Sequence, residues 1–184
     1  MPPKTSEADL LERARAGDVE AREDLIRAHL DAVYRTALRV LRDPDAAADA
    51  TQDTFVSAMQ ALGGFRGDSS VRTWLMRIAV NAARSIGRRR SRRREVALDV
   101  AADSPAAGDG AEARAVAVSQ ARRADAALAL LPEKQRLCVS LRIQEDLGYA
   151  EIGRIVGCSE AAARVNYHYG LKRLREVLGD DDAM

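Results

Sequence analysis

The sequence has few aromatic residues, few cysteines and no long apolar run. Phe, Trp and Tyr make up only 4% of its 184 residues, although 47% of the residues are hydrophobic and many of these are alanine. Alanine favours helices, whereas strands favour aromatic and β-branched residues, so this composition predicts an all-α protein. The two cysteines, Cys138 and Cys158, lack the spacing of a disulfide framework or a zinc site, and both are expected to be small buried residues.

No segment approaches the apolar length of a membrane span, and the N-terminus lacks a signal-peptide core. We therefore expect a cytoplasmic protein without membrane insertion. The formal net charge of +1 alone does not predict a nucleic-acid partner. The charges are segregated, however: basic residues crowd into 84–94 and 164–175, and acidic residues into 43–53, 95–112 and 180–182. Separate surfaces of this kind can bind a polyanion on one side and a basic partner on the other.

Apolar periodicity predicts two groups of helices. The first group covers about 6–16, 19–42, 46–62 and 71–94, and the second covers about 112–131, 133–141, 149–156 and 160–178. Between them, residues 95–111 are small and acidic, which is typical of a flexible linker. We therefore predict two small helical domains, 1–94 and 112–184, joined by a flexible acidic linker at 95–111.

The stretch 65–94 is the most informative part of the first domain. A loop at 67–70 leads into a helix that Asp68 or Ser69 is expected to cap. Trp74 lies in the apolar register of that helix and is predicted to be a core residue, which leaves Phe65 as the aromatic free to stack. The opposite face is basic and ends in an arginine run at 88–94. That run is either a solvated helix end or, as we favour, a contact to phosphates of a nucleic-acid strand.

A short helix at 149–156, a turn at 157–159 and a longer helix at 160–178 predict a helix-turn-helix. The small residues Gly153 and Ala163 allow the two helices to cross closely. The second helix presents polar and basic residues that suit a major groove and its flanking phosphates. Tyr167 either contacts a thymine methyl or sugar, or packs on its own domain. His29 and His168 are expected at the surface or in capping positions.

Three motifs resemble one family over nearly the whole chain: the bacterial sigma factors of the extracytoplasmic-function type. Residues 48–55 (ADATQDTF) resemble the signature of its second conserved region, and residues 65–81 resemble the promoter-melting part. Residues 131–136 (LPEKQR) with 148–153 (GYAEIG) resemble the start of its fourth region.

The resemblance implies a role for each set of residues. Asp49, Gln52, Asp53 and Phe55 would dock on the β′ clamp of core RNA polymerase. The minus-ten element of promoter DNA would be bound by Phe65, Arg66, Gly67, Asp68, Ser69, Ser70, Arg77, Asn81, Arg84 and Arg88. The minus-thirty-five element would be read, beside the β flap, by Ser159, Glu160, Ala162, Arg164, Asn166, Tyr167, His168, Lys172 and Arg173.

The resemblance also implies an anti-sigma factor as a partner, and neither a catalytic residue nor a cofactor. Two other functions compete with this one. An autonomous helix-turn-helix regulator would have no need of the acidic face at Asp49–Asp53. An enzyme acting on nucleic acid would need clustered metal-binding carboxylates or a phosphate-binding loop, and the sequence offers neither pattern. The expected function is therefore promoter-specific initiation as a polymerase subunit.

Overall fold

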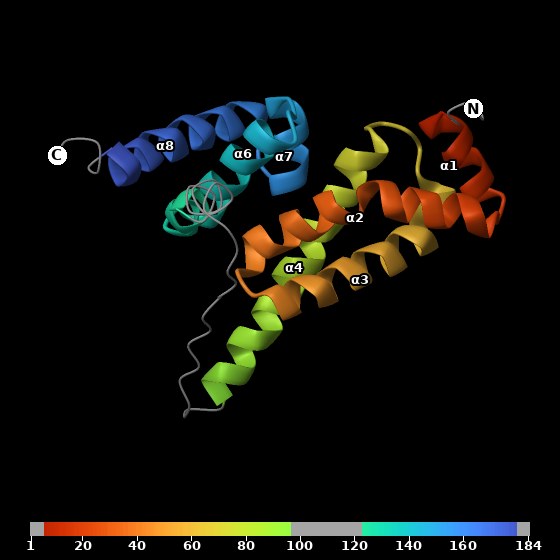
Figure 1. The fold of residues 1–184 in the computed structure, drawn as a ribbon, viewed down its shortest axis with the longest axis horizontal. Coiled ribbons are helices and arrows are strands. Elements are labelled where there is room, and N and C mark those ends of the chain that lie inside the picture. Colours follow the sequence, from red (N-terminus) through yellow and green to blue (C-terminus); the bar gives the residue numbers. More distant parts are fainter. Residues whose placement is uncertain (1–5, 97–122, 180–184) are drawn as a thin grey trace, which may run out of the picture.

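The computed structural model of the chain describes residues 6–96 and 123–179, and all regular structure in these two ranges is helical (Figure 1). This confirms the all-α prediction. From residue 97 on, the expected linker lies outside the described residues. Residues 123–129 are helical as well. The remaining elements in chain order are α1 (Glu7–Arg15), α2 (Val19–Leu41), α3 (Pro44–Ala61), the 3₁₀ turn η1 (Leu62–Gly64), α4 (Val71–Val96), α6 (Glu133–Gln144), α7 (Tyr149–Val156) and α8 (Glu160–Gly179).

Short polar side chains set where the first three helices begin. Ser6, Asp18 and Asp43 each accept a hydrogen bond from a backbone N–H in the first turn of the helix that follows. These side chains satisfy amide groups that have no partner within the helix. Between α2 and α3, Arg42 adopts a left-handed conformation with φ of 55°. The break predicted at residues 43–45 is therefore confirmed.

The cap of α4 differs from the prediction. Ser70, and not Asp68 or Ser69, caps this helix: its hydroxyl accepts the N–H of Thr73 at 3.1 Å. The same hydroxyl lies 2.8 Å from that of Thr73. The loop therefore ends at residue 70, as expected, but its last residue is the cap, and Asp68 is exposed.

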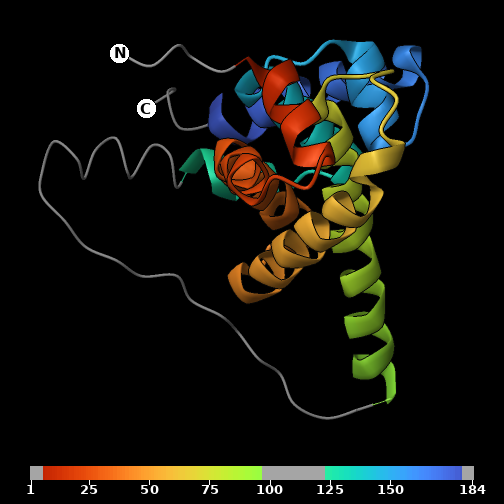
Figure 2. The same ribbon diagram turned by 90° about the vertical axis from the view of Figure 1, so that its right-hand side faces the viewer.

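Helices α1 to α4, which we call the N-terminal bundle, surround one apolar core. Helices α2, α3 and α4 pack against one another, and α1 covers α2. Figures 1 and 2 show the C-terminal end of α4 extending beyond the rest of the bundle. Trp74 is only 7% exposed, which confirms it as a core residue. The buried side chains of this core are Ala14, Ala21, Leu25, Val33, Phe55, Ala58, Leu62, Val71, Trp74, Leu75 and Ala79.

Helices α6 to α8, which we call the C-terminal bundle, pack directly on the N-terminal bundle. Met76 and Val80 of α4 and Ala32 of α2 belong to the same buried cluster as side chains of α6, α7 and α8. A helix that is apolar on more than one face is buried on each of them. Trp74 and Leu75 of α4 point into the core of the N-terminal bundle, whereas Met76 and Val80 point into the cluster shared with the C-terminal bundle. The C-terminal members of this cluster are Leu137, Cys138, Leu141, Leu147, Ile152, Ile155, Val156 and Ala163.

Polar side chains also cross this junction. The side chain of Glu145, which follows α6, is only 3% exposed. It forms ion pairs with Arg35 of α2, at 3.3 Å, and with Arg72 of α4. Nearby, the Thr73 hydroxyl donates to the carboxylate of Glu151 at 2.9 Å. A buried carboxylate is tolerated only with such partners, so the junction depends on these pairings.

The cysteines follow the prediction in part. Cys138 is fully buried, and burial raises the pKa of its thiol to about 12. Cys158 is only half-buried.

The two histidines lie in different surroundings. His168 is exposed, as predicted, but the expectation of a surface position for His29 is wrong. His29 is 9% exposed, and its Nε2 lies 3.2 Å from a carboxylate oxygen of Glu7. Burial lowers the pKa of His29 below its usual 6.5, and the charge of Arg72 lowers it further, whereas Glu7 opposes the shift. The imidazole is on the inner side of α2, where α1 closes over it.

This burial predicts acid sensitivity. The unfolded chain binds the histidine proton at a higher pH than the folded chain does, so His29 adds stability above pH 6.5. We expect that part of the unfolding free energy to be lost as the pH falls below 6.5 and through the lower folded-state pKa. Urea titrations at several values between pH 7 and pH 5 give the free energy of unfolding as a function of pH. That free energy should depend less steeply on pH for His29→Gln than for His168→Gln. Equal slopes would contradict the assignment.

Candidate nucleic-acid interface

A pocket of about 550 Å³ opens at the loop before α4. The loop bends at Gly67, whose φ of 79° favours glycine. The pocket walls combine an aromatic edge, a hydroxyl, a carboxylate and several guanidinium groups, which suits a nucleobase with its phosphate. The lining residues are Gly64, Phe65, Arg66, Asp68, Ser69, Trp74, Arg77 and Arg154.

Phe65 is not the free stacking surface that the sequence suggested. Its ring is half-buried, with its centroid 4.9 Å from that of Trp74, against which it is tilted by 39°. Arg15 of α1 also contacts Phe65: its guanidinium lies 5.7 Å from the ring centroid and donates to the carbonyls of Leu62 and Phe65. Phe65 therefore forms one fixed wall of the pocket.

A polar stripe runs along α4 from this pocket toward the end of the helix. Arg77, Asn81, Arg88 and Arg92 are exposed and recur at helical spacing on one face. At 1.5 Å per residue the stripe is about 22 Å long, so it can follow several phosphates of a nucleic-acid strand. The arginines at 88–90, 92 and 93, near the end of the helix, are all exposed.

Arg84, in the middle of this stripe, is engaged within the chain. Its Nε donates to Glu133 of α6 at 2.9 Å, and its terminal nitrogens donate to the Val156 carbonyl of α7 at 3.1 and 3.2 Å. The structure therefore brings Arg77, Asn81 and Arg88 together on an open face and ties Arg84 to the C-terminal bundle. Arg84 can reach DNA only when these bonds break.

The predicted helix-turn-helix is confirmed. Helix α7 ends at Gly157, which is left-handed with φ of 80°, and Ser159 accepts the N–H of Ala162 at 3.2 Å to cap α8. The two helices approach closely at Gly153, where an added Cβ would lie 2.7 Å from the Cys158 carbonyl oxygen. Only glycine fits this crossing, which sets the angle of α8.

The first turns of α8 present fewer base-reading groups than the sequence suggested. Glu160, Arg164 and His168 are exposed, as are Lys172 and Arg173 further along. The Arg164 guanidinium also forms an ion pair with Glu160 at 3.2 Å. Together these residues form a polar and basic face that suits a major groove and its flanking phosphates.

Two predicted members of this face are used within the chain. Asn166 is half-buried, and its amide nitrogen donates to the Ala162 carbonyl at 2.8 Å. Tyr167 packs edge-on against Tyr149 at 5.7 Å. The arrangement therefore favours the packing role that the sequence left open for Tyr167.

Tyr149 organises several of these side chains. The guanidinium groups of Arg142 and Arg164 lie 5.4 and 5.2 Å from its ring centroid. Contacts between arginine and an aromatic face hold a flexible side chain in place. Sequence reasoning missed Tyr149 and Arg142, because neither lies on α8. It also missed Arg154, which the fold brings to the pocket from α7, and Arg15 of α1, which contacts the Phe65 ring.

Helix α3 presents the acidic face that the sequence predicted. Asp49, Gln52 and Asp53 are exposed, whereas Phe55 is 7% exposed and belongs to the first core. Phe55 and Gln52 nevertheless border a mainly apolar groove of about 560 Å³ between α2 and α3, together with Leu30. Leu30 is 47% exposed. This face offers carboxylates beside apolar surface, which suits a basic protein partner.

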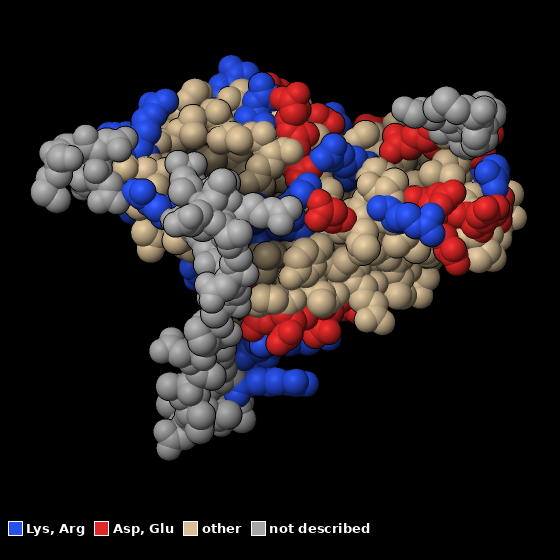
Figure 3. Space-filling model, viewed as in Figure 1, with Lys and Arg blue, Asp and Glu red and all other residues tan. Residues whose placement is uncertain are grey.

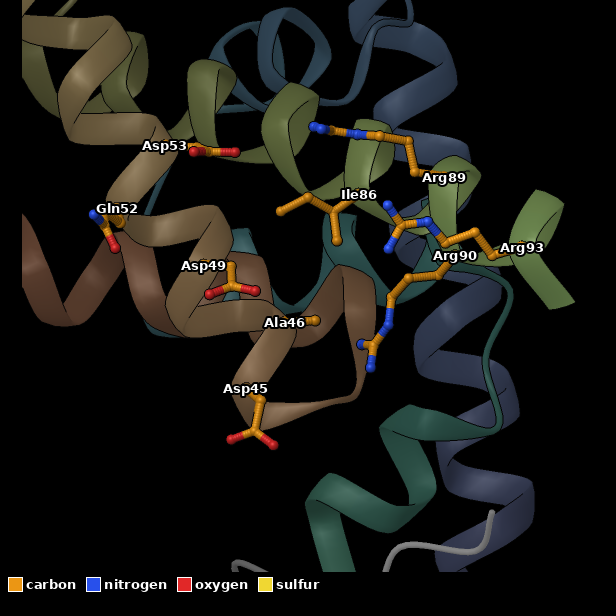
Figure 4. A pocket seen from close by; sticks show the side chains of 9 residues that line it. All are labelled: Asp45, Ala46, Asp49, Gln52, Asp53, Ile86, Arg89, Arg90 and Arg93. Carbon is orange, nitrogen blue, oxygen red and sulfur yellow. The ribbon is translucent and has the colours of Figure 1, made fainter. Parts of the chain in front are cut away.

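A second cleft, of about 450 Å³, separates α3 from the arginine end of α4 (Figure 4). Figure 3 shows carboxylates directly beside arginine side chains at the lower edge of the molecule, where α3 begins. The acidic wall consists of Asp45, Asp49 and Asp53, and the basic wall consists of Arg89, Arg90 and Arg93. Arg90 forms an ion pair with Asp43 at 2.7 Å.

These features define a class: a two-part helical DNA-binding protein with a loop pocket, a basic track and a helix-turn-helix. Comparison with known families identifies the family within this class. Residues 25–95 match the Sigma-70 region 2 family, and residues 121–174 match the Sigma-70 region 4 family. The chain belongs to the extracytoplasmic-function sigma factors of bacterial RNA polymerase.

Relatives that match over most of both chains support this family assignment. The chain is 34% identical over 172 residues to RNA polymerase sigma factor CarQ of Myxococcus xanthus, covering 92% of this chain and 96% of CarQ. It is 32% identical over 174 residues to ECF RNA polymerase sigma factor SigM of Mycobacterium tuberculosis, covering 95% of this chain and 85% of SigM.

Solved structures show the same fold. The sigma factor RpoE in complex with the anti-sigma factor NepR from Bartonella quintana matches with a TM-score of 0.70 at 23% identity, covering 88% of this chain and 98% of RpoE. CnrH in complex with the cytosolic domain of CnrY matches with a TM-score of 0.69 at 22% identity, covering 97% of this chain and 99% of that one.

The chain is therefore a specificity factor for transcription initiation and not an enzyme. It binds core RNA polymerase and promoter DNA. This excludes the autonomous regulator and the nucleic-acid enzyme as alternatives. In the two described ranges, no helix combines the length and the apolar character needed to cross a membrane.

Proposed function

We propose that residues 1–94 dock on the polymerase clamp and bind and melt the minus-ten element, and that residues 112–184 read the minus-thirty-five element beside the flap. The observation that carries the proposal is the loop pocket at the start of the Arg77–Arg92 stripe. A pocket of this kind at one end of a basic track can hold a displaced base while the track holds its strand.

Promoter opening by this route needs no covalent chemistry. Unstacking one base costs a few kcal/mol, which contacts to a flipped base can offset. The fixed Phe65 edge, the Ser69 hydroxyl and the Asp68 carboxylate supply apolar and hydrogen-bonding surface to the base. Arg66 and Arg77 supply charge to its phosphates. Because the Phe65 ring is held by Trp74 and Arg15, the pocket is largely preformed.

The exposed face of α3 is the proposed docking surface for core polymerase. Asp49, Gln52 and Asp53 point away from the first core. Surface carboxylates in a row favour association with a basic partner and speed its encounter. The adjacent apolar groove between α2 and α3 would add buried area to the contact.

The C-terminal bundle is the proposed reader of the minus-thirty-five element. The first turns of α8 carry Glu160, Arg164 and His168 toward base edges, and Lys172 and Arg173 lie nearer phosphates. Tyr149 limits the directions that Arg164 can take. We also propose that the protein acts in the cytoplasm and that an anti-sigma factor controls it. Support for such a partner comes from the two structural neighbours, each solved in complex with a second protein.

A charge-reversal pair tests the docking surface. Asp49→Lys with Asp53→Lys should weaken binding to core polymerase by at least about tenfold, because two attractive contacts become repulsive. Run-off transcription should fall in parallel. Glu12→Lys with Glu23→Lys, which changes the same charge on the exposed faces of α1 and α2, is the control. Equal losses for both pairs would rule out α3 as the docking surface.

A salt titration tests the basic track. Neutralising Arg77, Arg88 and Arg92 to glutamine in the polymerase complex removes three phosphate contacts, which should reduce the slope of log K against log salt by about 2.7. Filter binding of promoter DNA at several salt concentrations measures that slope. An unchanged slope would mean that these arginines are solvated and do not touch the DNA backbone.

A further inference from the structure

The cleft between α3 and the end of α4 places opposite charges on facing walls. Figure 4 shows Arg89 and Arg93 extending from α4 toward α3, where Asp49 and Asp53 border the same opening. Ile86 and Ala46 form the apolar floor between the walls. The cleft therefore joins two surfaces to which different partners have been assigned above.

One contact shows that the two walls can pair directly. The Arg90 guanidinium lies 2.7 Å from the carboxylate of Asp43, the residue that caps α3. Both side chains are partly exposed, at 43% and 32%. The backbone N–H of Ala46 lowers the pKa of Asp43, and Arg90 lowers it further, so this carboxylate stays charged at neutral pH. At the mouth of the cleft an arginine is already neutralised by the chain itself.

We propose that the carboxylates of α3 compete with the DNA backbone for the arginines at the end of α4, and so weaken DNA binding by the free chain. The inference rests on the proposed contact between this arginine end and phosphates. Charges within a Debye length, about 8–10 Å at moderate salt, interact without full screening. A phosphate approaching Arg89, Arg90 or Arg93 is therefore repelled by Asp45, Asp49 and Asp53 as well as attracted by the arginines.

The same carboxylates belong to the proposed docking surface, which links the two partners. A basic surface seated on Asp49 and Asp53 would neutralise the acidic wall and remove its repulsion of phosphate. Linkage is reciprocal: if a partner on α3 strengthens DNA binding, DNA on α4 strengthens binding of that partner by the same factor. Promoter affinity would then depend on occupancy of the acidic wall.

The first test uses the free chain and a nonspecific DNA duplex. Asp49→Asn with Asp53→Asn should tighten binding about fivefold at about 50 mM salt, and less at about 200 mM, because screening weakens the repulsion that is removed. The control, Glu12→Gln with Glu23→Gln, removes the same charge from α1 and from the beginning of α2, which lie far from the end of α4 in both ribbon views (Figures 1 and 2). An equal gain in the control, or no gain in the test pair, would overturn the proposal.

A double-mutant cycle shows whether the gain in DNA affinity depends on the arginines that line the cleft. Arg89→Gln with Arg93→Gln should abolish the gain produced by the two asparagines. Arg88→Gln with Arg92→Gln, the neighbouring pair with the same spacing and no part in lining the cleft, should lower DNA affinity and leave the gain intact. A gain that survives loss of Arg89 and Arg93 would overturn the proposal.

The result can be separated from the proposed docking role by measuring core polymerase binding of the same Asp49→Asn and Asp53→Asn variant. Tighter DNA binding by the free chain supports internal competition whether or not polymerase binding falls. Unchanged polymerase binding would count against the docking surface alone. Loss of polymerase binding with unchanged DNA binding would count against the competition alone.

Discussion

Replacement of Glu145 by alanine is expected to lower the free energy of unfolding by about 3 kcal/mol, the lower end of the range for breaking a buried ion pair. The lower end applies because Arg35 and Arg72, whose side chains are 41% and 40% exposed, can regain water. For a chain of this length the loss corresponds to a fall in melting temperature of about 6–12 °C. Calorimetry measures both quantities.

A matched control is Asp146→Asn, which removes the neighbouring negative charge and keeps a side chain that tolerates the left-handed φ of 49° at this position. The side chain of Asp146 is 97% exposed, and its distance to Arg142 is 3.6 Å. Exposed pairs of this kind contribute about 1 kcal/mol or less. If both variants melted at the same temperature, Glu145 would not be holding the two bundles together. Relative to the unmodified chain, the Glu145 variant should also show a larger increase in hydrogen exchange in α7 than in α3, because α7 packs on α4 at the junction.

The substitution Gly153→Ala should have an effect of similar size at a different place. The new Cβ would lie 2.7 Å from the carbonyl oxygen of Cys158 and 3.3 Å from the Ser159 carbonyl carbon. Backbone atoms cannot move aside as a flexible side chain can, so we expect a loss of about 2–3 kcal/mol, the upper part of the range for overpacking. Because this crossing sets the angle of α8, the proposed binding to the minus-thirty-five element should weaken as well.

Gly63→Ala controls for the general effect of adding a methyl group. Gly63 lies in η1, and a Cβ there would meet no atom within 4 Å. Thermal unfolding and binding to a selected minus-thirty-five duplex should both remain close to those of the unmodified chain. If the Gly153 and Gly63 variants had the same melting temperature and the same duplex affinity, α7 and α8 would be able to move apart without loss of stability.

Local sequence patterns predicted the parts of this fold that depend on neighbours in the chain. Ser6 and the break at Asp43-Pro44 marked helix ends, and the Gly153–Gly157 spacing marked the helix-turn-helix. The apolar register placed Trp74 in the core. Each of these features involves residues within about one helical turn or one loop of each other, where backbone geometry and capping decide the outcome.

Contacts between distant segments could not be predicted in this way. Glu145 meets Arg35 and Arg72 across 110 and 73 residues, and Arg84 meets Val156 across 72. The alternation of Trp74 and Leu75 with Met76 and Val80 was the available signal, since it gives α4 more than one apolar face. Periodicity shows that a face is buried but does not say which element covers it.

The shared core between the bundles has a consequence for which promoters are used. The minus-ten and minus-thirty-five elements lie about 25 base pairs, or about 85 Å, apart on duplex DNA. If the two bundles bind these elements as proposed, they cannot do so while packed together, because even the 26 residues of α4 span only about 39 Å. Binding to both elements would then expose Met76 and Val80 to water. That cost would reduce the apparent affinity for every promoter by the same factor, so that only sites with strong contacts at both elements would remain occupied.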